Sequence, residues 1–151
     1  MSHADLLPGE PVEIERKFLV TGDAWRGRGR VETIRQGYLP TAADCTVRVR
    51  IVGDRGFLTV KSVARGGVRA EFEYPIPVDH AAFMLRRFCV GRTIEKRRHW
   101  VRQEGANWTV DEFLGVHAGL FLAEIELDRI DRPIELPLWV GREVTGDPRA
   151  I

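Results

Sequence analysis

The stretch that decides the fold is Glu13-Ile14-Glu15-Arg16-Lys17-Phe18-Leu19-Val20, where charged and apolar side chains mostly alternate. Alternate residues of a β-strand share a face, so a strand here presents Glu13, Glu15 and Lys17 together. Two carboxylates at this spacing repel each other unless a positive charge lies between them, and a divalent cation with oxygen ligands meets that need. The lysine beyond them could then hold an anion.

Length and composition favour one domain with its own core. The chain has 151 residues, which fits the usual size of a single domain, and we expect an amino-terminal tail over residues 1–11 and one domain over residues 12–151. The 23 basic and 22 acidic residues nearly balance, which argues against a broad surface for nucleic acid or membrane. No apolar run approaches the roughly 20 residues that cross a bilayer, and the start lacks the pattern of a signal peptide.

The two cysteines, Cys45 and Cys89, form no spacing typical of a zinc site or a disulfide framework. Free thiols are the rule in a reducing compartment, so we expect a cytoplasmic protein. An exposed strand edge would permit a homodimer, although closure of the sheet into a barrel would remove that edge.

Strand patterns follow the opening stretch at regular intervals. Runs of β-type residues occupy 33–39, 46–52, 57–63, 68–76, 93–103, 107–113 and 120–128. Turns at 53–56, 66–67 and 104–106 each contain glycine and separate two runs, which is typical of antiparallel hairpins.

One helix is expected between these strands. Asp79 is a candidate cap, the helix would run to about Cys89, and Gly91 would stop it. The expected apolar stripe for packing on the sheet consists of Ala82, Phe83, Leu85 and Phe88. The sequence therefore predicts an α+β fold in which an antiparallel sheet of eight strands, closed as a barrel, carries a few packed helices.

Charged residues recur at every second position of the predicted strands and are sorted by sign from strand to strand. They are Glu13, Glu15, Lys17, Arg48, Arg50, Lys61, Arg69, Glu71, Glu73, Lys96, Arg98, Asp111, Glu124 and Glu126. An ordinary sheet with one wet face is the commoner explanation of such alternation. Like charges side by side destabilise a strand, however, so the sorted sets favour an inward face where acidic and basic walls oppose each other.

Such a cavity suits a polyanion that brings a metal ion. Arginine forks pair with phosphate oxygens, lysine adds a point charge, and Mg²⁺ or Mn²⁺ bridges phosphate to carboxylates. A triphosphate is the expected ligand. No Gly-Lys-Ser or Gly-Lys-Thr phosphate loop is present, so side chains would have to hold the phosphates.

These residues resemble the triphosphate tunnel metalloenzymes, also called the CYTH superfamily, whose hallmark is a Glu-x-Glu-x-Lys strand near the amino terminus. The resemblance runs from about residue 12 to residue 148. It rests on Glu13-x-Glu15-x-Lys17, Arg35-Gln36-Gly37-Tyr38-Leu39, Arg48-x-Arg50, Lys61, Glu71-x-Glu73, Lys96-x-Arg98, Asp111, Glu124-x-Glu126 and Trp139-x-Gly141-x-Glu143-Val144-Thr145.

The resemblance implies an eight-stranded tunnel that binds triphosphates with Mg²⁺ or Mn²⁺. It implies metal binding by Glu13, Glu15, Glu124 and Glu126, with Glu71, Glu73 and Asp111 contributing directly or through water. It implies phosphate binding by Lys17, Arg48, Arg50, Lys61, Lys96 and Arg98. Thr145-Gly146-Asp147 corresponds to a Thr-x-Asp region of the family. The family usually continues after it with Arg-Tyr, an Asn and a helix at one tunnel mouth, whereas here Arg149 is followed by Ala150 and Ile151.

The expected activity is metal-dependent hydrolysis of inorganic triphosphate, because chains of this size resemble bacterial inorganic triphosphatases. A class IV adenylyl cyclase, an organic triphosphatase acting on thiamine or nucleoside triphosphates, and a noncatalytic polyphosphate-binding module remain alternatives, since the fold alone does not choose among them. A second metal, or a lysine such as Lys17 or Lys96 with a depressed pKa, would activate the water.

Other polar and aromatic residues give weaker signals. Tyr38 is a candidate for contacting the substrate, with packing in the strand as an equal alternative. Trp100 and Trp108 flank a hairpin turn and are more typical of cross-strand packing than of base stacking. The basic loop from Arg26 to Arg30 is more typical of a solvated surface.

Overall fold

The sheet of this protein closes on itself. The computed structural model describes residues 11–91, 93–103 and 105–149. Its strands are β1 (Val12–Val20), β2 (Val31–Leu39), β3 (Cys45–Val52), β4 (Arg55–Ser62), β5 (Val68–Ile76), β6 (Thr93–Gln103), β7 (Ala106–Phe113), β8 (Phe121–Glu126) and β9 (Val140–Glu143). The described helices are α1 (Val78–Arg87) and the short 3-10 helix η2 (Gly115–His117). The predicted tail over residues 1–11 lies outside the described part apart from Pro11.

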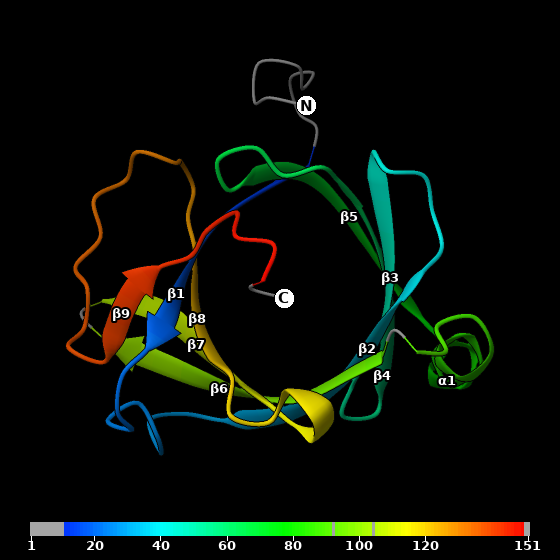
Figure 1. The fold of residues 1–151 in the computed structure, drawn as a ribbon, viewed down its shortest axis with the longest axis horizontal. Coiled ribbons are helices and arrows are strands. Elements are labelled where there is room, and N and C mark those ends of the chain that lie inside the picture. The colour runs from blue at the N-terminus through cyan, green and yellow to red at the C-terminus, as the bar shows by residue number, and fades with distance from the viewer. Residues whose placement is uncertain (1–10, 92, 104, 150–151) are drawn as a thin grey trace.

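All neighbouring strands pair antiparallel, in the order β5-β4-β3-β2-β6-β7-β8-β1-β9. A further pairing closes the ring, because the start of β1 pairs with β5 at Ile14 and Val68 before β1 continues along β8. Figure 1 looks down the bore of this ring. The predicted closed barrel of eight strands is confirmed, and β9 is an additional strand that pairs with the end of β1 beyond its contact with β5.

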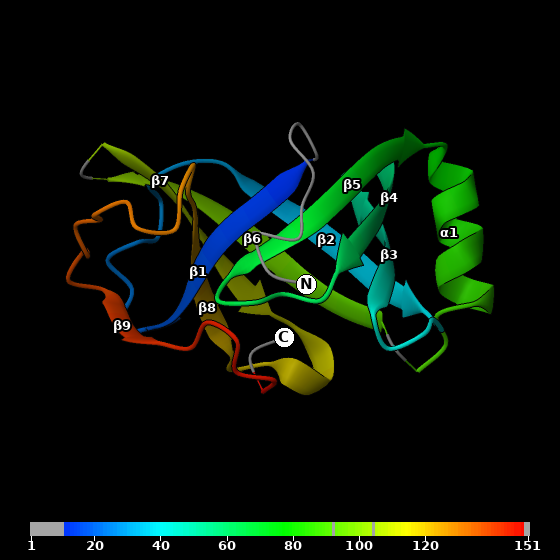
Figure 2. The same cartoon turned by 90° about the horizontal axis from the view of Figure 1, so that it is seen from above.

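Helix α1 lies on the outside of the barrel against β3 and β4 (Figure 2). The predicted packing stripe is partly wrong, because Ala81, Leu85 and Cys89 are buried whereas Phe83 and Phe88 are 44% and 53% exposed. A methyl group at Gly37 would lie 2.7 Å from the Cβ of Cys89, just after the helix, and 3.1 Å from the Leu85 side chain, so the sheet meets this buried side of the helix closely at Gly37.

The predicted cap of this helix is also wrong. Pro77 occupies the N-cap position, and no side chain there donates or accepts a capping hydrogen bond. Asp79 lies within the first turn, where its carboxylate still interacts favourably with the positive end of the helix dipole.

The apolar core lies outside the barrel ring. The outward sides of β1, β6, β7 and β8 are covered by Trp25, from the segment after β1, and Trp139, from the segment after β8. Trp108 is fully buried in this cluster, with its ring centre 5.7 Å from that of Trp139, which confirms the packing expected for Trp108. Because apolar side chains of these strands are buried outward, their alternate charged side chains point into the bore. No helix in the described ranges is both long and apolar enough to span a membrane.

Candidate active site

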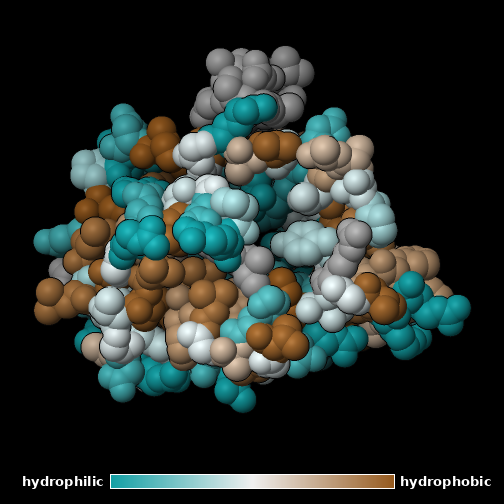
Figure 3. All heavy atoms as spheres, in the orientation of Figure 1, coloured by the Kyte–Doolittle hydropathy of each residue, from teal (hydrophilic) through white to brown (hydrophobic). Residues whose placement is uncertain are grey.

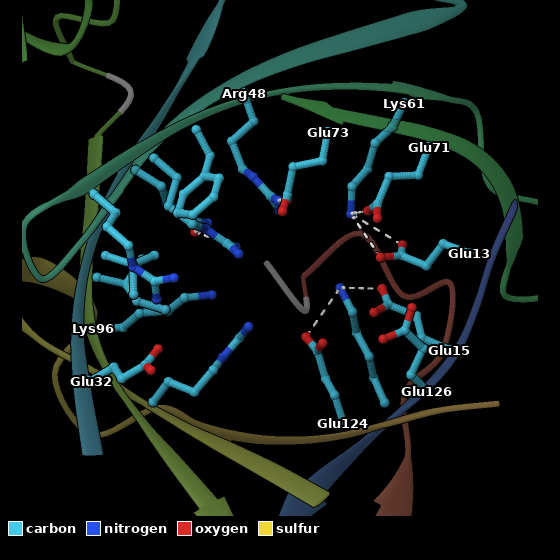
Figure 4. A pocket seen from close by; sticks show the side chains of 18 of the residues that line it. Glu13, Glu15, Glu32, Arg48, Lys61, Glu71, Glu73, Lys96, Glu124 and Glu126 are labelled. Carbon is cyan, nitrogen blue, oxygen red and sulfur yellow. Dashed lines mark hydrogen bonds and ion pairs between the residues drawn. The ribbon is translucent and has the colours of Figure 1, made fainter. Parts of the chain in front are cut away.

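The barrel encloses a cavity of about 440 Å³ with a mostly charged wall. The lining side chains come from seven strands of the ring, and within the described residues β7 contributes none. A hollow lined by hydrophilic residues opens near the middle of the face shown in Figure 3. Figure 4 shows the side chains converging on this space from all sides.

The structure brings nearly all the predicted site residues together around this cavity. Those that line it are Glu13, Glu15, Lys17, Tyr38, Arg48, Arg50, Lys61, Glu71, Glu73, Lys96, Arg98, Glu124 and Glu126. Asp111 is the exception, because it does not reach the cavity.

An acidic wall forms where β1 meets β8. Glu15 and Glu126 are direct cross-strand partners, an arrangement that destabilises a sheet when both are charged. Burial and the neighbouring Glu124 and Glu13 raise the pKa of Glu15 to about 8. Lys17 lies between the two strands, with its Nζ atom 3.8 Å from a Glu15 oxygen and 3.9 Å from a Glu124 oxygen.

A second group of carboxylates is held by cations at the junction of β1 and β5. Lys61 Nζ lies 3.1 Å from a Glu13 oxygen and 3.0 Å from a Glu71 oxygen. Burial alone would raise the pKa of Glu13, but its hydrogen bond with Glu71 and the charges of Lys61 and Arg69 lower it to about 2. Arg69 contacts Glu13 at 3.1 Å and Glu15 at 3.5 Å, and so joins the two groups.

These carboxylates are candidate ligands of a divalent cation. The raised pKa of Glu15 and its pairing with Glu126 show a surplus of negative charge that a cation would relieve. Within the described residues, no three carboxylates converge as a complete metal site would require, and Lys17 and Lys61 lie between them. A cation there would therefore take further oxygen ligands from phosphate or water, as magnesium commonly does.

A basic wall faces the acidic one. Arg50 is 9% exposed and donates hydrogen bonds of 3.0 and 2.7 Å to the neutral Gln36 side chain. Burial, Arg48 and Arg98 lower the pKa of Arg50 to about 10. Across the described parts of the chain, no carboxylate oxygen lies within 4 Å of its guanidinium. A buried cation without a counter-ion is unfavourable, so Arg50 favours an anion in the cavity.

Asp111 lies behind the basic wall and holds two of its cations. Its carboxylate is 1% exposed and lies 2.7 Å from Lys96 Nζ, while Arg98 donates two hydrogen bonds to it, of 2.8 and 2.9 Å. Burial would raise the pKa of Asp111, but these two cations hold it far below its usual value. Both carboxylate oxygens are used in these contacts, so Asp111 positions the two cations, and its contribution to a metal site, directly or through water, stays a prediction.

This environment lowers the pKa of Lys96. Burial lowers its pKa to about 8 despite the opposing effect of Asp111, and the charges of Arg98 and Arg50 lower it further. A lysine with a pKa of about 8 can accept and release a proton near neutral pH.

The sequence reasoning missed two supporting residues. Arg69 was recognised as part of the alternating pattern but was given no role, although it precedes Glu71 and Glu73 on the same face. Gln36 orients Arg50, and the signal that could have revealed it is its position two residues before Tyr38 on the inward face of β2.

Comparisons with known proteins agree with this geometry. The CYTH domain family matches residues 11–151. An inorganic triphosphatase from Acetivibrio thermocellus is 48% identical over 137 residues, which cover 91% of this chain and 88% of that protein. The crystal structure of the inorganic triphosphatase NE1496 has 35% identity and a TM-score of 0.65, covering 91% of this chain and 92% of that one.

A more distant structure shares the fold alone. A putative adenylate cyclase from Bacillus halodurans is 18% identical, with a TM-score of 0.62 over 81% of this chain and 83% of that one. The charged tunnel, the match to the CYTH domain over residues 11–151 and the 48% identity to a curated relative lead to one conclusion. This chain is a member of the CYTH family.

Proposed function

We propose that this protein is an inorganic triphosphatase, which hydrolyses a phosphoanhydride bond of tripolyphosphate within the barrel. The observation that carries the proposal is the basic wall around Arg50, a buried guanidinium that lacks a carboxylate partner among the described residues. A triphosphate supplies the missing negative charge. Its similarity to two proteins named inorganic triphosphatase supports the same substrate.

The phosphates would lie between the two walls. We assign Arg48, Arg50, Arg98, Lys17, Lys61 and Lys96 to the phosphate oxygens, because all six line the cavity. Phosphoryl transfer depends mainly on positioning and on neutralising the charge that develops on the transferred group. Arginine side chains whose guanidinium groups are held by neighbours are suited to this task, as Arg50 is held by its hydrogen bond to Gln36.

The acidic wall would hold the divalent cation that the family implies, which we propose to be Mg²⁺ or Mn²⁺. Glu13, Glu15, Glu124 and Glu126 are the proposed ligands, with Glu71 and Glu73 contributing directly or through water. When bound, the cation would neutralise phosphate charge and polarise the phosphorus–oxygen bonds.

Lys96 is the proposed group that accepts the proton of the attacking water. Its pKa of about 8 leaves a neutral fraction near neutral pH, and Asp111 fixes its position. Tyr38, which lies opposite Arg48 on the neighbouring strand and lines the cavity, is proposed to orient the water or a phosphate oxygen. Lys17, between Glu15 and Glu124, is proposed to bind the phosphates beside the cation.

The proposed location is the cytoplasm. Cys45 and Cys89 are both free thiols, which fits a reducing compartment.

The test is phosphate release from tripolyphosphate, ATP and thiamine triphosphate in parallel, with Mg²⁺, Mn²⁺ or a chelator. We expect fast, metal-dependent release from tripolyphosphate and much slower release from the organic substrates. Cyclic AMP with pyrophosphate from ATP would instead identify a cyclase, and tight binding without turnover would identify a noncatalytic module.

Two variants locate the reaction in the tunnel. Glu15→Gln should lower kcat by about a hundredfold or more while the protein stays folded, because it removes a strong electrostatic contact. Glu135→Gln changes an exposed glutamate and is the matched control, with wild-type kinetics expected. Normal turnover by the Glu15 variant would exclude the acidic wall from the reaction.

A further inference from the structure

One end of the tunnel has a lining that the proposed chemistry does not use. Arg30, Arg55, Val52, Phe57 and Trp100 line the cavity there. The register shows that these residues share one end, because the Trp100 N–H donates to the Arg30 carbonyl at 2.9 Å and Val52 pairs with Arg55. The strands β6, β2, β3 and β4 are consecutive neighbours, so these residues form a continuous rim.

Each arginine of this rim lies over an aromatic ring. The Arg30 guanidinium carbon lies 4.2 Å from the ring centre of Trp100, and that of Arg55 lies 5.5 Å from the ring centre of Phe57. Arg30 is further restrained by an ion pair of 3.0 Å with Glu32, yet its side chain is 64% exposed. Stacking therefore holds two cations at the edge of the cavity while leaving them accessible to solvent.

The opposite end of the tunnel is crossed by the chain itself. Residues 144–149 lie in front of the bore in Figure 1, and Figure 2 places them at the end away from the start of β2. Hydrogen bonds fix the start of this segment, because Val144 N–H donates to the Lys17 carbonyl at 2.8 Å and Lys17 N–H donates to the Thr145 hydroxyl at 2.9 Å. The hollow of Figure 3 opens beside this segment, so residues 144–149 border one mouth of the charged cavity and the arginine rim borders the other.

We propose that the polyanionic substrate enters the tunnel at this rim, and that Arg30 and Arg55 form a capture site for its leading phosphate groups. This inference rests on the proposed function of the same cavity. Paired cations at the mouth of a cleft raise the rate at which an anion is captured, and the effect falls as salt screens the charges. Neither arginine belongs to the two walls around the reacting phosphates, so their loss should lower kcat/KM and leave kcat nearly unchanged.

The test compares two double variants that each remove two arginines stacked on aromatic rings. Arg30→Ala with Arg55→Ala removes the rim. Arg86→Ala with Arg87→Ala is the matched control, since these guanidinium carbons lie 5.6 and 5.5 Å from the Phe83 ring centre on the outside of the barrel. Hydrolysis of tripolyphosphate with Mg²⁺ is measured from low to high ionic strength.

We expect the rim variant to lose about tenfold or more in kcat/KM at low ionic strength, to keep kcat within about twofold, and to depend less on salt than the wild type. The control should match the wild type in all three quantities. An unchanged kcat/KM, or an equal loss in the control, would overturn the capture site, and an equal fall in kcat would make Arg30 and Arg55 part of the reaction itself.

A charge-preserving variant covers the case in which the rim variant does not fold. Arg30→Lys with Arg55→Lys keeps both charges without the guanidinium stacks, so its kcat/KM and salt dependence should remain within about threefold of the wild type if charge is what captures the anion. A tenfold loss in this folded variant would overturn electrostatic capture. Absence of turnover in the wild type would refute the proposed function instead, and tripolyphosphate binding by calorimetry would still test the rim.

Discussion

Replacing Asp111 by asparagine should destabilise the folded protein and leave its metal requirement unchanged. Asp111 is 1% exposed, and its only charged partners in the described chain are Lys96, at 2.7 Å, and Arg98, at 2.8 Å. Asparagine keeps the shape and one acceptor but removes the charge that compensates two cations. Removing one member of a buried ion pair typically costs about 3–5 kcal/mol.

This loss is large enough to measure by thermal unfolding. For a domain of this size each kcal/mol shifts the midpoint by roughly 2–4 °C, so the Asp111→Asn variant should unfold roughly 6–20 °C below the wild type. Because Asp111 raises the pKa of Lys96, the same variant should lower that pKa below about 8. Saturating tripolyphosphate should restore part of the lost stability, since phosphate replaces the missing negative charge.

Asp128→Asn is the control, because Asp128 pairs with Arg132 on the surface, where its side chain is 64% exposed. Exposed ion pairs contribute little to stability because water screens them, so the control should unfold within about 4 °C of the wild type. The reasoning is refuted if Asp111→Asn is as stable as the control while its apparent affinity for Mg²⁺ falls at least tenfold, since that result would identify Asp111 as a metal ligand.

Further predictions concern charge, pH and packing. Arg50→Met should leave the substrate-free protein at least as stable as the wild type, because it removes a buried uncompensated cation. The same variant should raise KM for tripolyphosphate roughly tenfold or more. A wild-type KM would contradict the assignment of Arg50 to phosphate. The pKa of Glu15 is about 8 in the folded protein and near 4.5 in the unfolded chain. Its contribution to the free energy of unfolding is therefore fully present below pH 4.5 and is lost as the pH rises to 8, by up to about 5 kcal/mol. Thermal unfolding in chelator from pH 5 to 8 should show this decline, and a decline of equal size in Glu15→Gln would assign it to other groups. Gly37→Ala should cost about 1–3 kcal/mol in urea unfolding without changing KM, since the new methyl group would lie 2.7 Å from the Cys89 Cβ; unchanged stability would show that the helix can move away.

The sequence predicted the barrel well because strand alternation is a short-range signal. Charged side chains at every second position, as in Glu13-x-Glu15-x-Lys17, lie on one face wherever the strand goes, and the sorting by sign indicated that this face turns inward. Strand β9 was missed because four residues, Val140–Glu143, are too short to show a period.

The alternation does not predict how far a side chain reaches into the cavity or which side of the helix packs on the sheet. Asp111 shares the inward face with Lys96 and Arg98, but its shorter side chain stays behind those two longer ones, and only the three-dimensional register reveals this. The packing face of α1 was mispredicted in part, because hydrophobicity favours Phe83 and Phe88 whereas the structure buries Ala81 and Leu85.

The pairing of β1 also sets an order of assembly. The strand that carries Glu15 and Lys17 pairs with β5 through Val68 and with β8 through Glu124, so its partners lie about fifty and about a hundred residues later in the chain. Contacts so distant in sequence form slowly, and a ribosome must synthesise β8 before the first strand can find its second neighbour. The acidic wall therefore comes together only near the end of synthesis, and a chain that still lacks β8 holds its hallmark motif without a tunnel to complete it.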